Sequence, residues 1–223
     1  MSIVISSETV KDYGLNAGAD IVGIAAVGDF CLAPDGYRPS DVLEGCRSVI
    51  VLGATFPKEV LKDITEYTAT RNEMLTKMTD MAKAVAKQVK KQGCNVKAIS
   101  ASGGKTIDGK HLGHISLKHA AELAGLGTIN RNYLLTNHQY GNLLWVSAVL
   151  TDAELIPDGK AQEKTCDGCN KCVESCPSGA LDDSALFGRK GCSKFFVIEN
   201  KKFLIKCFRC RTVCPYGLGS AAT

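Results

Sequence analysis

The stretch CDGCNKCVESCP, residues 166–177, decides what the C-terminal part of the chain folds around. Its cysteines follow the spacing C-x2-C-x2-C-x3-C-P, which is typical of bacterial proteins that hold 4Fe-4S clusters. The two-residue gaps let three thiolates reach three corners of one cubane, while the last cysteine ligates the other cluster of a pair. The run therefore predicts an iron–sulfur domain with two clusters.

A second run, CFRCRTVCP at 207–215, repeats the end of this pattern without its first cysteine. With the same wiring, Cys207 and Cys210 bind the second cluster and Cys214 crosses back to the first. The second cluster then lacks a ligand, and we expect Cys192 to supply it because this cysteine lies between the two runs. The expected ligands are, for the first cluster, Cys166, Cys169, Cys172 and Cys214, and, for the second, Cys176, Cys192, Cys207 and Cys210.

Zinc and disulfides are the alternatives for the eleven cysteines of the chain. Structural zinc sites usually show separated C-x2-C pairs, whereas here three cysteines share one run. The odd cysteine count argues against a simple disulfide framework, and the N-terminus shows neither a secretory signal nor a twin-arginine motif. No apolar run is long enough to cross a membrane. We therefore expect a cytoplasmic protein with no membrane partner, and a structural role for Cys31, Cys46 and Cys94.

The formal net charge of +4 does not by itself predict nucleic-acid binding. Four thiolates leave an oxidised cubane with a net negative charge, so two clusters would offset about four positive charges. The basic residues are therefore interpreted as a counterbalance to buried anionic clusters.

The residues before the first cysteine run alternate between helical and strand periodicity, with 68–92 as the clearest helix. The turn PDGK at 157–160 and the polar stretch after it mark a boundary between a domain of residues 1–158 and a cysteine-rich domain of residues 159–223. FFVIE, which follows Cys192, reads as a short helix or an extended segment. The expected helices cover 7–18, 68–92 and 116–124, the last with Ser116 as N-cap, and the expected strands cover 21–27, 48–56, 96–100 and 143–150.

Two glycine-containing stretches fail as nucleotide-binding motifs. SGGKT at 102–106 has Ile99 where a phosphate-binding loop needs glycine. AGLGTINRN at 124–132 follows a helix, whereas the dinucleotide fingerprint follows a strand. The glycines of the second stretch can still let the backbone approach a ligand closely.

Four segments resemble the catalytic core of epoxyqueuosine reductases, a family related to corrinoid-dependent reductive dehalogenases. The resemblance implies an α+β protein, with an N-terminal α/β sandwich related to flavin nitroreductases that holds cobalamin, and a ferredoxin-like two-cluster domain packed over the corrinoid. Electrons would pass from a donor such as a ferredoxin or flavodoxin through the clusters to cobalt. The segments are RPSDVLEGCRSVIVLG (38–53), LKHAAELAGLGTINRNYLL (117–135), CDGCNKCVESCPSGAL (166–181) with CSKFFVIE (192–199), and CFRCRTVCP (207–215).

The same resemblance assigns residues to the corrinoid site. Asn130 stands where the family has glycine, and asparagine tolerates a left-handed backbone. The family's catalytic aspartate aligns with His111, and Asp108 lies three residues before it. Independently of the resemblance, His111 and His114 lie in an expected turn and could reach a cleft as acid, base or hydrogen-bond donor; the alternative is that they are surface histidines without a role. The implied cofactor-binding residues are Gly125, Gly127, Arg131 and Asn132.

The expected function is an iron–sulfur oxidoreductase that passes electrons through two clusters to a cofactor, which reduces a small molecule or a nucleoside. The helical-repeat domain with which the family grips tRNA has no counterpart in the 223 residues, so tRNA is not expected as a substrate. The alternative is an electron-transfer protein or reductive activator that serves a partner enzyme and has no substrate site of its own.

Overall fold

The structure is a computed structural model of the chain, and its residues fall into two compact units that are interleaved in sequence. The first unit comprises Met1–Thr55, Met74–Gly127 and Trp145–Gln162, and the second comprises Phe56–Glu73, Thr128–Leu144 and Glu163–Thr223. The predicted boundary after residue 158 divides the chain only once and stays a prediction. The residues that the structure describes are 5–101, 104–107, 110–162, 166, 168–182, 192–199 and 202–220.

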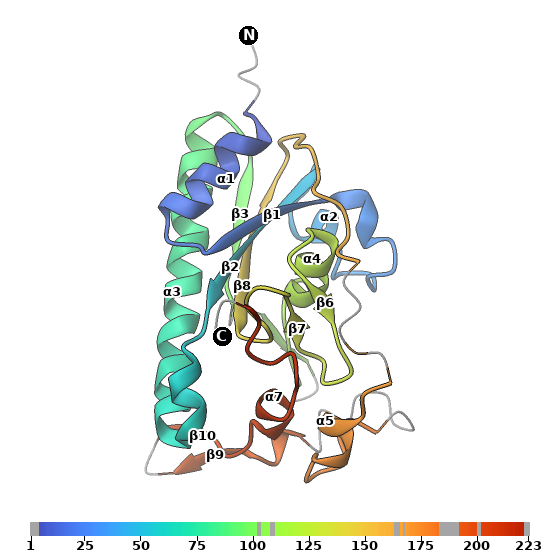
Figure 1. The fold of residues 1–223 in the computed structure, drawn as a ribbon. Coiled ribbons are helices and arrows are strands. Elements are labelled where there is room, and N and C mark those ends of the chain that lie inside the picture. The colour runs from blue at the N-terminus through green and yellow to red at the C-terminus, as the bar shows by residue number, and fades with distance from the viewer. Residues whose placement is uncertain are drawn as a thin grey trace. The chain divides into compact units, whose positions relative to one another are not determined.

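The first unit is built on a four-stranded sheet with the order β1-β2-β8-β3 (Figure 1). These strands are β1 (Ile21–Ala26), β2 (Ser48–Thr55), β3 (Val96–Ile99) and β8 (Leu144–Thr151). β1 pairs antiparallel with β2, and β3 pairs antiparallel with β8. The two central strands are almost wholly buried, which fits their unbroken apolar sequences. All four strands were expected from their β-branched residues, and they are confirmed to within a few residues at each end.

Helices pack on both faces of this sheet. A Cβ atom on Gly14 of α1 (Ser7–Asn16) would lie 2.5 Å from Val22 of β1. A Cβ atom on Gly23, the next residue of β1, would lie 2.2 Å from the backbone oxygen of Ala124 at the end of α4 (Leu117–Leu123). Successive residues of a strand point to opposite faces, so α1 and α4 cover opposite faces of the sheet. Only glycine, which has no Cβ atom, permits the helix and the strand to lie this close together at these two positions.

The longest helix, α3 (Ile64–Lys91), starts four residues before the predicted start at residue 68. The Asp63 carboxylate accepts hydrogen bonds from the backbone N–H groups of Thr65 and Glu66, at 2.8 and 2.7 Å, and so caps the helix earlier than its apolar stripe begins. Met74, Met78 and Met81 are buried on that stripe as packing residues. Among the described residues, no helix is both long enough and apolar enough to span a membrane.

The connections of the first unit carry several short elements. The predicted N-cap Ser116 does occupy that position of α4, but its hydroxyl hydrogen-bonds to His119 Nδ1, 2.6 Å away, instead of to the helix backbone. The short elements are η1 (Val27–Phe30), α2 (Pro39–Val42), β4 (Lys105–Ile107) and β5 (Lys110–Leu112).

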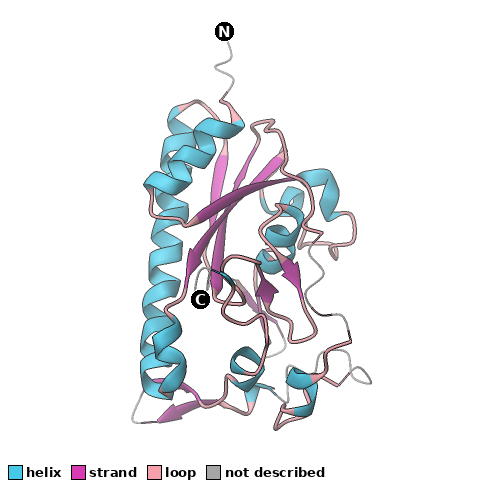
Figure 2. Cartoon of the chain, viewed as in Figure 1, coloured by secondary structure: helices cyan, strands magenta, loops and turns pink. Residues whose placement is uncertain are grey.

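Apart from the first turns of the long helix, the second unit consists of short helices and strands (Figure 2). Phe196–Glu199 forms β9, which decides between the helical and extended alternatives expected for FFVIE. It pairs antiparallel with β10 (Lys202–Ile205), a strand that the sequence did not predict. The other elements are η2 (Lys58–Lys62), β6 (Thr128–Ile129), β7 (Leu135–Thr136), α5 (Lys171–Glu174) and α7 (Arg209–Thr212).

The first turns of α3 belong to the core of this second unit. The Tyr67 ring lies 5.1 Å from the ring of Phe56 and 4.7 Å from that of Phe208, measured between ring centroids. Phe208 stands between two cysteines of the closing run, so this aromatic packing anchors that run to the helix.

Candidate iron–sulfur site

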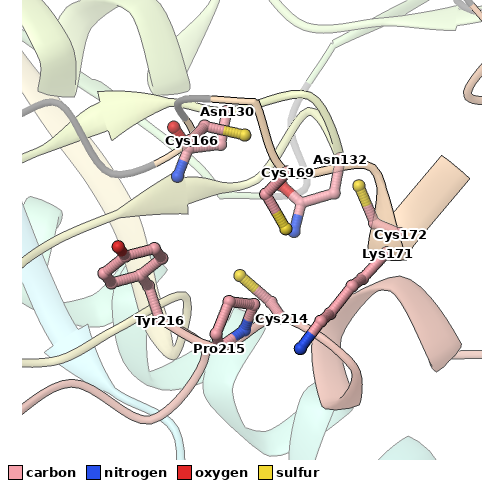
Figure 3. Close-up of a pocket in the computed structure, with 9 residues that line it drawn as sticks. All are labelled: Asn130, Asn132, Cys166, Cys169, Lys171, Cys172, Cys214, Pro215 and Tyr216. Atoms are coloured by element: carbon pink, nitrogen blue, oxygen red, sulfur yellow. The ribbon is translucent and has the colours of Figure 1, made fainter.

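Four cysteines from the two runs line one pocket of the second unit (Figure 3). The pocket encloses about 290 Å³ of empty space, counting the part that is open to solvent. In Figure 3 the sulfur atoms of Cys169 and Cys214 face each other across it. These four cysteines are the set expected for the first cluster. The lining residues are Cys166, Cys169, Cys172 and Cys214, together with Asn130, Asn132, Lys171, Pro215 and Tyr216.

The segment that follows Cys214 is held in place by glycines. The N–H of Gly217 donates to the carbonyl of Cys214, and the carbonyl of Gly217 accepts from the N–H of Asn142, both at 2.9 Å. A Cβ atom on Gly141 would lie 2.2 Å from the Gly217 oxygen, and one on Gly219 would lie 2.2 Å from the Gly141 nitrogen. Close backbone contact therefore fixes the segment after Cys214 against the turn that precedes β8.

Electrostatic coupling also links the pocket cysteines. Burial raises the pKa of the Cys172 thiol, and the neighbouring thiolates of Cys166 and Cys214 raise it further. These surroundings disfavour a thiolate that has no positive charge beside it. Binding to a positively charged iron core would therefore stabilise the thiolate form of Cys172.

The environment of Cys214 has opposing effects on the pKa of its thiol. Burial raises the pKa of its thiol, and the nearby Cys166 and Cys169 act in the same direction. Hydrogen bonds from the Tyr216 backbone and from the Asn142 side chain oppose this effect. Donors aimed at the sulfur are a common feature of iron–sulfur ligands, because they stabilise the negative charge of the thiolate.

A second group of cysteines surrounds Cys210 at the start of α7. Burial raises the pKa of the Cys210 thiol to about 11. The positive charge of Arg211 opposes this rise, whereas Cys192, Cys207 and Cys172 add to it. The cysteines that act on Cys210 thus include Cys192 and Cys207, which are expected at the second cluster, and Cys172, which is expected at the first.

Cys176, the fourth cysteine expected at the second cluster, is held by local interactions. Burial raises the pKa of its thiol, but hydrogen bonds from the Ser178 hydroxyl, 3.5 Å away, and from backbone N–H groups of Ser178, Ala180 and Leu181 outweigh this effect and lower the pKa overall. A row of donors around one sulfur favours the thiolate form that an iron ligand requires.

The loop between β6 and β7 reaches both cysteine runs. Asn132, which is 5% exposed, donates from Nδ2 to the carbonyl of Cys210 at 3.1 Å. Arg131 donates to the side-chain oxygen of Asn170, in the first run, at 2.6 Å. Tyr133, with φ of 56°, is the left-handed residue of this loop, whereas the resemblance suggests that conformation for Asn130. Two residues expected to bind the corrinoid therefore support the cysteine loops.

The remaining residues expected at a corrinoid site lie elsewhere. Gly125 and Gly127 belong to the first unit with φ angles of 77° and 145°, and a Cβ atom on Gly125 would lie 3.1 Å from the Gly159 oxygen. His114 lines a separate pocket of the first unit with Tyr37 and Lys97.

The other two acid–base candidates cannot be placed. Asp108 lies outside the described residues, as does the side chain of His111, although the backbone of His111 pairs with Thr106 in the β4–β5 hairpin. Across the described part of the chain, no three histidine, cysteine or carboxylate side chains form a group that could hold a single metal ion.

Comparison with known proteins identifies the cysteine-rich part. Residues 165–218 match the family described as 4Fe-4S dicluster domain. Over 98% of its length the chain is 22% identical to the epoxyqueuosine reductase of Bacillus subtilis, of which it covers 65%. It is 26% identical, over 79% of its length, to that of Gloeobacter violaceus, of which it covers 58%. The chain is a homologue of the epoxyqueuosine reductases. It spans less than two thirds of the length of these relatives.

Solved structures show the same fold. A crystal structure of epoxyqueuosine reductase with a modified tRNA stem loop aligns with 94% of this chain and 64% of its own, with a TM-score of 0.67 and 19% identity. A reductive dehalogenase described in terms of B12-dependent dehalogenation aligns with 96% of this chain and 32% of its own, with a TM-score of 0.74 and 21% identity. The homologue is therefore a mixed α/β protein with a ferredoxin-like dicluster domain. Its expected relation to flavin nitroreductases stays a prediction.

One expectation is corrected by these findings. The chain was not expected to act on tRNA, because the helical-repeat domain has no counterpart in it. That prediction is wrong, since its homologues are epoxyqueuosine reductases and one solved structure of that enzyme holds a tRNA stem loop. The end of the sequence says nothing about which substrates the protein accepts.

Proposed function

We propose that this homologue is an iron–sulfur oxidoreductase whose second unit holds two 4Fe-4S clusters. The observation that carries the proposal is the pocket lined by four cysteines from two runs, in which Cys214 lies 42 residues after Cys172 in the sequence. Thiolates are the ligands of such clusters, and the alternation of ligands between the runs is the wiring of two-cluster ferredoxins. The proposed ligands are Cys166, Cys169, Cys172 and Cys214 for the first cluster, and Cys176, Cys192, Cys207 and Cys210 for the second.

We further propose cobalamin as the acceptor of the electrons. The similarity in fold to a dehalogenase associated with B12 supports this cofactor. Gly127, with a φ of 145°, is the residue that we propose lets the backbone approach this cofactor closely. When bound, cobalamin would supply a low-valent cobalt centre with strong reducing power.

The substrate class that we propose is an oxygenated nucleoside such as an epoxide. The names of the homologous enzymes support this class, and the structure with a modified stem loop supports a nucleoside carried within RNA. Removal of an epoxide oxygen to leave an alkene consumes two electrons and two protons and releases one water molecule. Two clusters, each of which carries one electron at a time, suit this demand.

Anaerobic purification and reconstitution test the proposal. We expect close to eight iron and eight sulfide per chain, and a change in the absorption spectrum of added cobalamin that reports binding. Reduced protein should then convert an epoxyqueuosine nucleoside, either free or within a tRNA stem loop, and the comparison of the two identifies the form accepted. Stoichiometric zinc without sulfide would refute the two-cluster proposal. Clusters without cobalamin binding or turnover would favour a role in electron transfer to a partner enzyme.

A further inference from the structure

Arg211 is a buried cation between two cysteines of the closing run. It lies in α7, directly after Cys210 and three residues before Cys214, and is 7% exposed. Its guanidinium donates to the backbone carbonyl of Asn142 and to the side-chain oxygen of the same residue, the latter at 3.2 Å. Both acceptors are neutral, so they satisfy its hydrogen bonds without offsetting its charge. A buried charge of this kind calls for an anion nearby.

Asn142 connects this cation to the pocket. The residue is 1% exposed, and its Nδ2 donates to the carbonyl of Arg211 at 3.1 Å. Its Nδ2 would lie 3.3 Å from a Cβ atom on Gly217, in the segment after Cys214, and hydrogen bonding from its side chain opposes the rise in the pKa of the Cys214 thiol. The charge of Arg211 meanwhile acts on Cys210, in the other group of cysteines. The pair therefore reaches one cysteine of each proposed cluster.

We propose that Arg211 and Asn142 raise the reduction potentials of the two clusters, each acting mainly on a different one. Arg211 acts chiefly on the cluster that Cys210 ligates, and Asn142 on the cluster that Cys214 ligates. This inference rests on the two clusters of the proposed function. The anionic cluster would then act as a counter-charge for the buried guanidinium.

The physical reason lies in the charge added on reduction. A cluster that takes one electron from solution becomes more negative by one unit while its ligands stay the same. A buried cation stabilises the reduced form strongly, because little water screens the interaction. A hydrogen bond to a ligand sulfur acts in the same direction, and net charge, hydrogen bonds to sulfur and solvent exposure are the factors that set cluster potentials.

The test is an anaerobic redox titration of protein that holds eight iron atoms, with dithionite as reductant and the clusters followed by electron paramagnetic resonance. Signals are assigned to each cluster beforehand with Cys166→Ala and Cys207→Ala. We expect Arg211→Gln, which keeps an N–H donor but removes the charge, to lower the equilibrium constant for reduction of the Cys210 cluster about tenfold. This is about 59 mV for a one-electron couple. Arg211→Lys, which keeps the charge, should restore most of the wild-type potential.

Arg209→Gln is the matched control, because Arg209 lies on the same helix and beside the same cysteine but is exposed to solvent. We expect it to change either equilibrium constant less than twofold, since water and salt screen its charge. Asn142→Ser should lower the potential of the Cys214 cluster and leave that of the other cluster within twofold of wild type.

Unchanged potentials in Arg211→Gln with eight iron atoms retained would overturn the role of Arg211. Equal shifts in Arg211→Gln and Arg209→Gln would do the same. If Arg211→Gln loses iron, Asn142→Ser decides, and an unchanged Cys214 cluster would overturn the inference. Wild-type protein without eight iron atoms would instead refute the two-cluster proposal on which the inference depends.

Discussion

The backbone N–H of Ile205 donates to the buried hydroxyl of Thr68 at 3.1 Å. Thr68 lies in the first turns of α3, and Ile205 ends β10, two residues before Cys207. The same hydroxyl donates a hydrogen bond to the carbonyl of Ile64 at 2.8 Å. It therefore acts as both donor and acceptor, and the two bonds fix its orientation. One threonine thus ties the start of the closing cysteine run to the long helix.

We predict that Thr68→Val destabilises the protein by about 1–3 kcal/mol, because it leaves the buried N–H of Ile205 without an acceptor while keeping the side-chain shape. Chemical denaturation of the apoprotein measures this difference. Thr65→Val is the control, since Thr65 lies on the same helix but is exposed, and it should change stability by no more than about 0.5 kcal/mol. Equal effects of the two substitutions would show that the hydrogen bond to Ile205 does not contribute.

A second prediction concerns the glycine that holds the segment after Cys214. A Cβ atom on Gly217 would lie 2.8 Å from the Arg211 oxygen and 2.9 Å from the Cys214 oxygen. Both neighbours are backbone atoms that cannot easily move, so Gly217→Ala should destabilise the protein by about 1–3 kcal/mol. We also expect faster loss of iron to a chelator, because the displaced backbone carries Cys214. Gly28→Ala, where a Cβ atom would meet nothing within 4 Å, should leave both measurements unchanged.

The grouping of the pocket cysteines could be anticipated from sequence because ligand spacing is a local property. Gaps of two residues constrain where Cys166, Cys169 and Cys172 can point, whatever the rest of the chain does. The central strands were equally predictable, since β2 and β8 are unbroken apolar runs that must be buried.

Other features depend on partners that are distant in sequence, and local patterns do not reveal them. Arg211 looks like an ordinary surface arginine until Asn142, 69 residues away, encloses its guanidinium. β10 becomes a strand because it pairs with β9, and the earlier start of α3 depends on a cap by Asp63 that lies outside the apolar stripe. The sequence does contain a signal for the earlier start of α3, namely an Asp residue that lies two positions before a threonine and three before a glutamate.

The third prediction tests the exchange of ligands between the two runs. Cys214 follows Cys207 and Cys210 in sequence, yet it lines the same pocket as Cys166. We therefore expect Cys214→Ala to disturb the same paramagnetic signal of the reduced protein as Cys166→Ala. If Cys214→Ala altered the signal that Cys207→Ala removes, the proposed wiring would be wrong.

The last prediction concerns Cys192, which belongs to neither run but acts electrostatically on Cys210. Without it the second cluster would keep Cys176, Cys207 and Cys210, and the iron atom at the open corner would be exposed to exchange. We predict that Cys192→Ala yields a 3Fe-4S centre or loses the second cluster, while the first cluster persists. Iron analysis together with electron paramagnetic resonance distinguishes these products.

The controls are Cys31→Ala, Cys46→Ala and Cys94→Ala. These cysteines belong to the first unit, so their replacement should leave eight iron atoms in place. Full iron content in Cys192→Ala, with a loss of iron in one of the controls, would mean that the eighth ligand comes from the first unit.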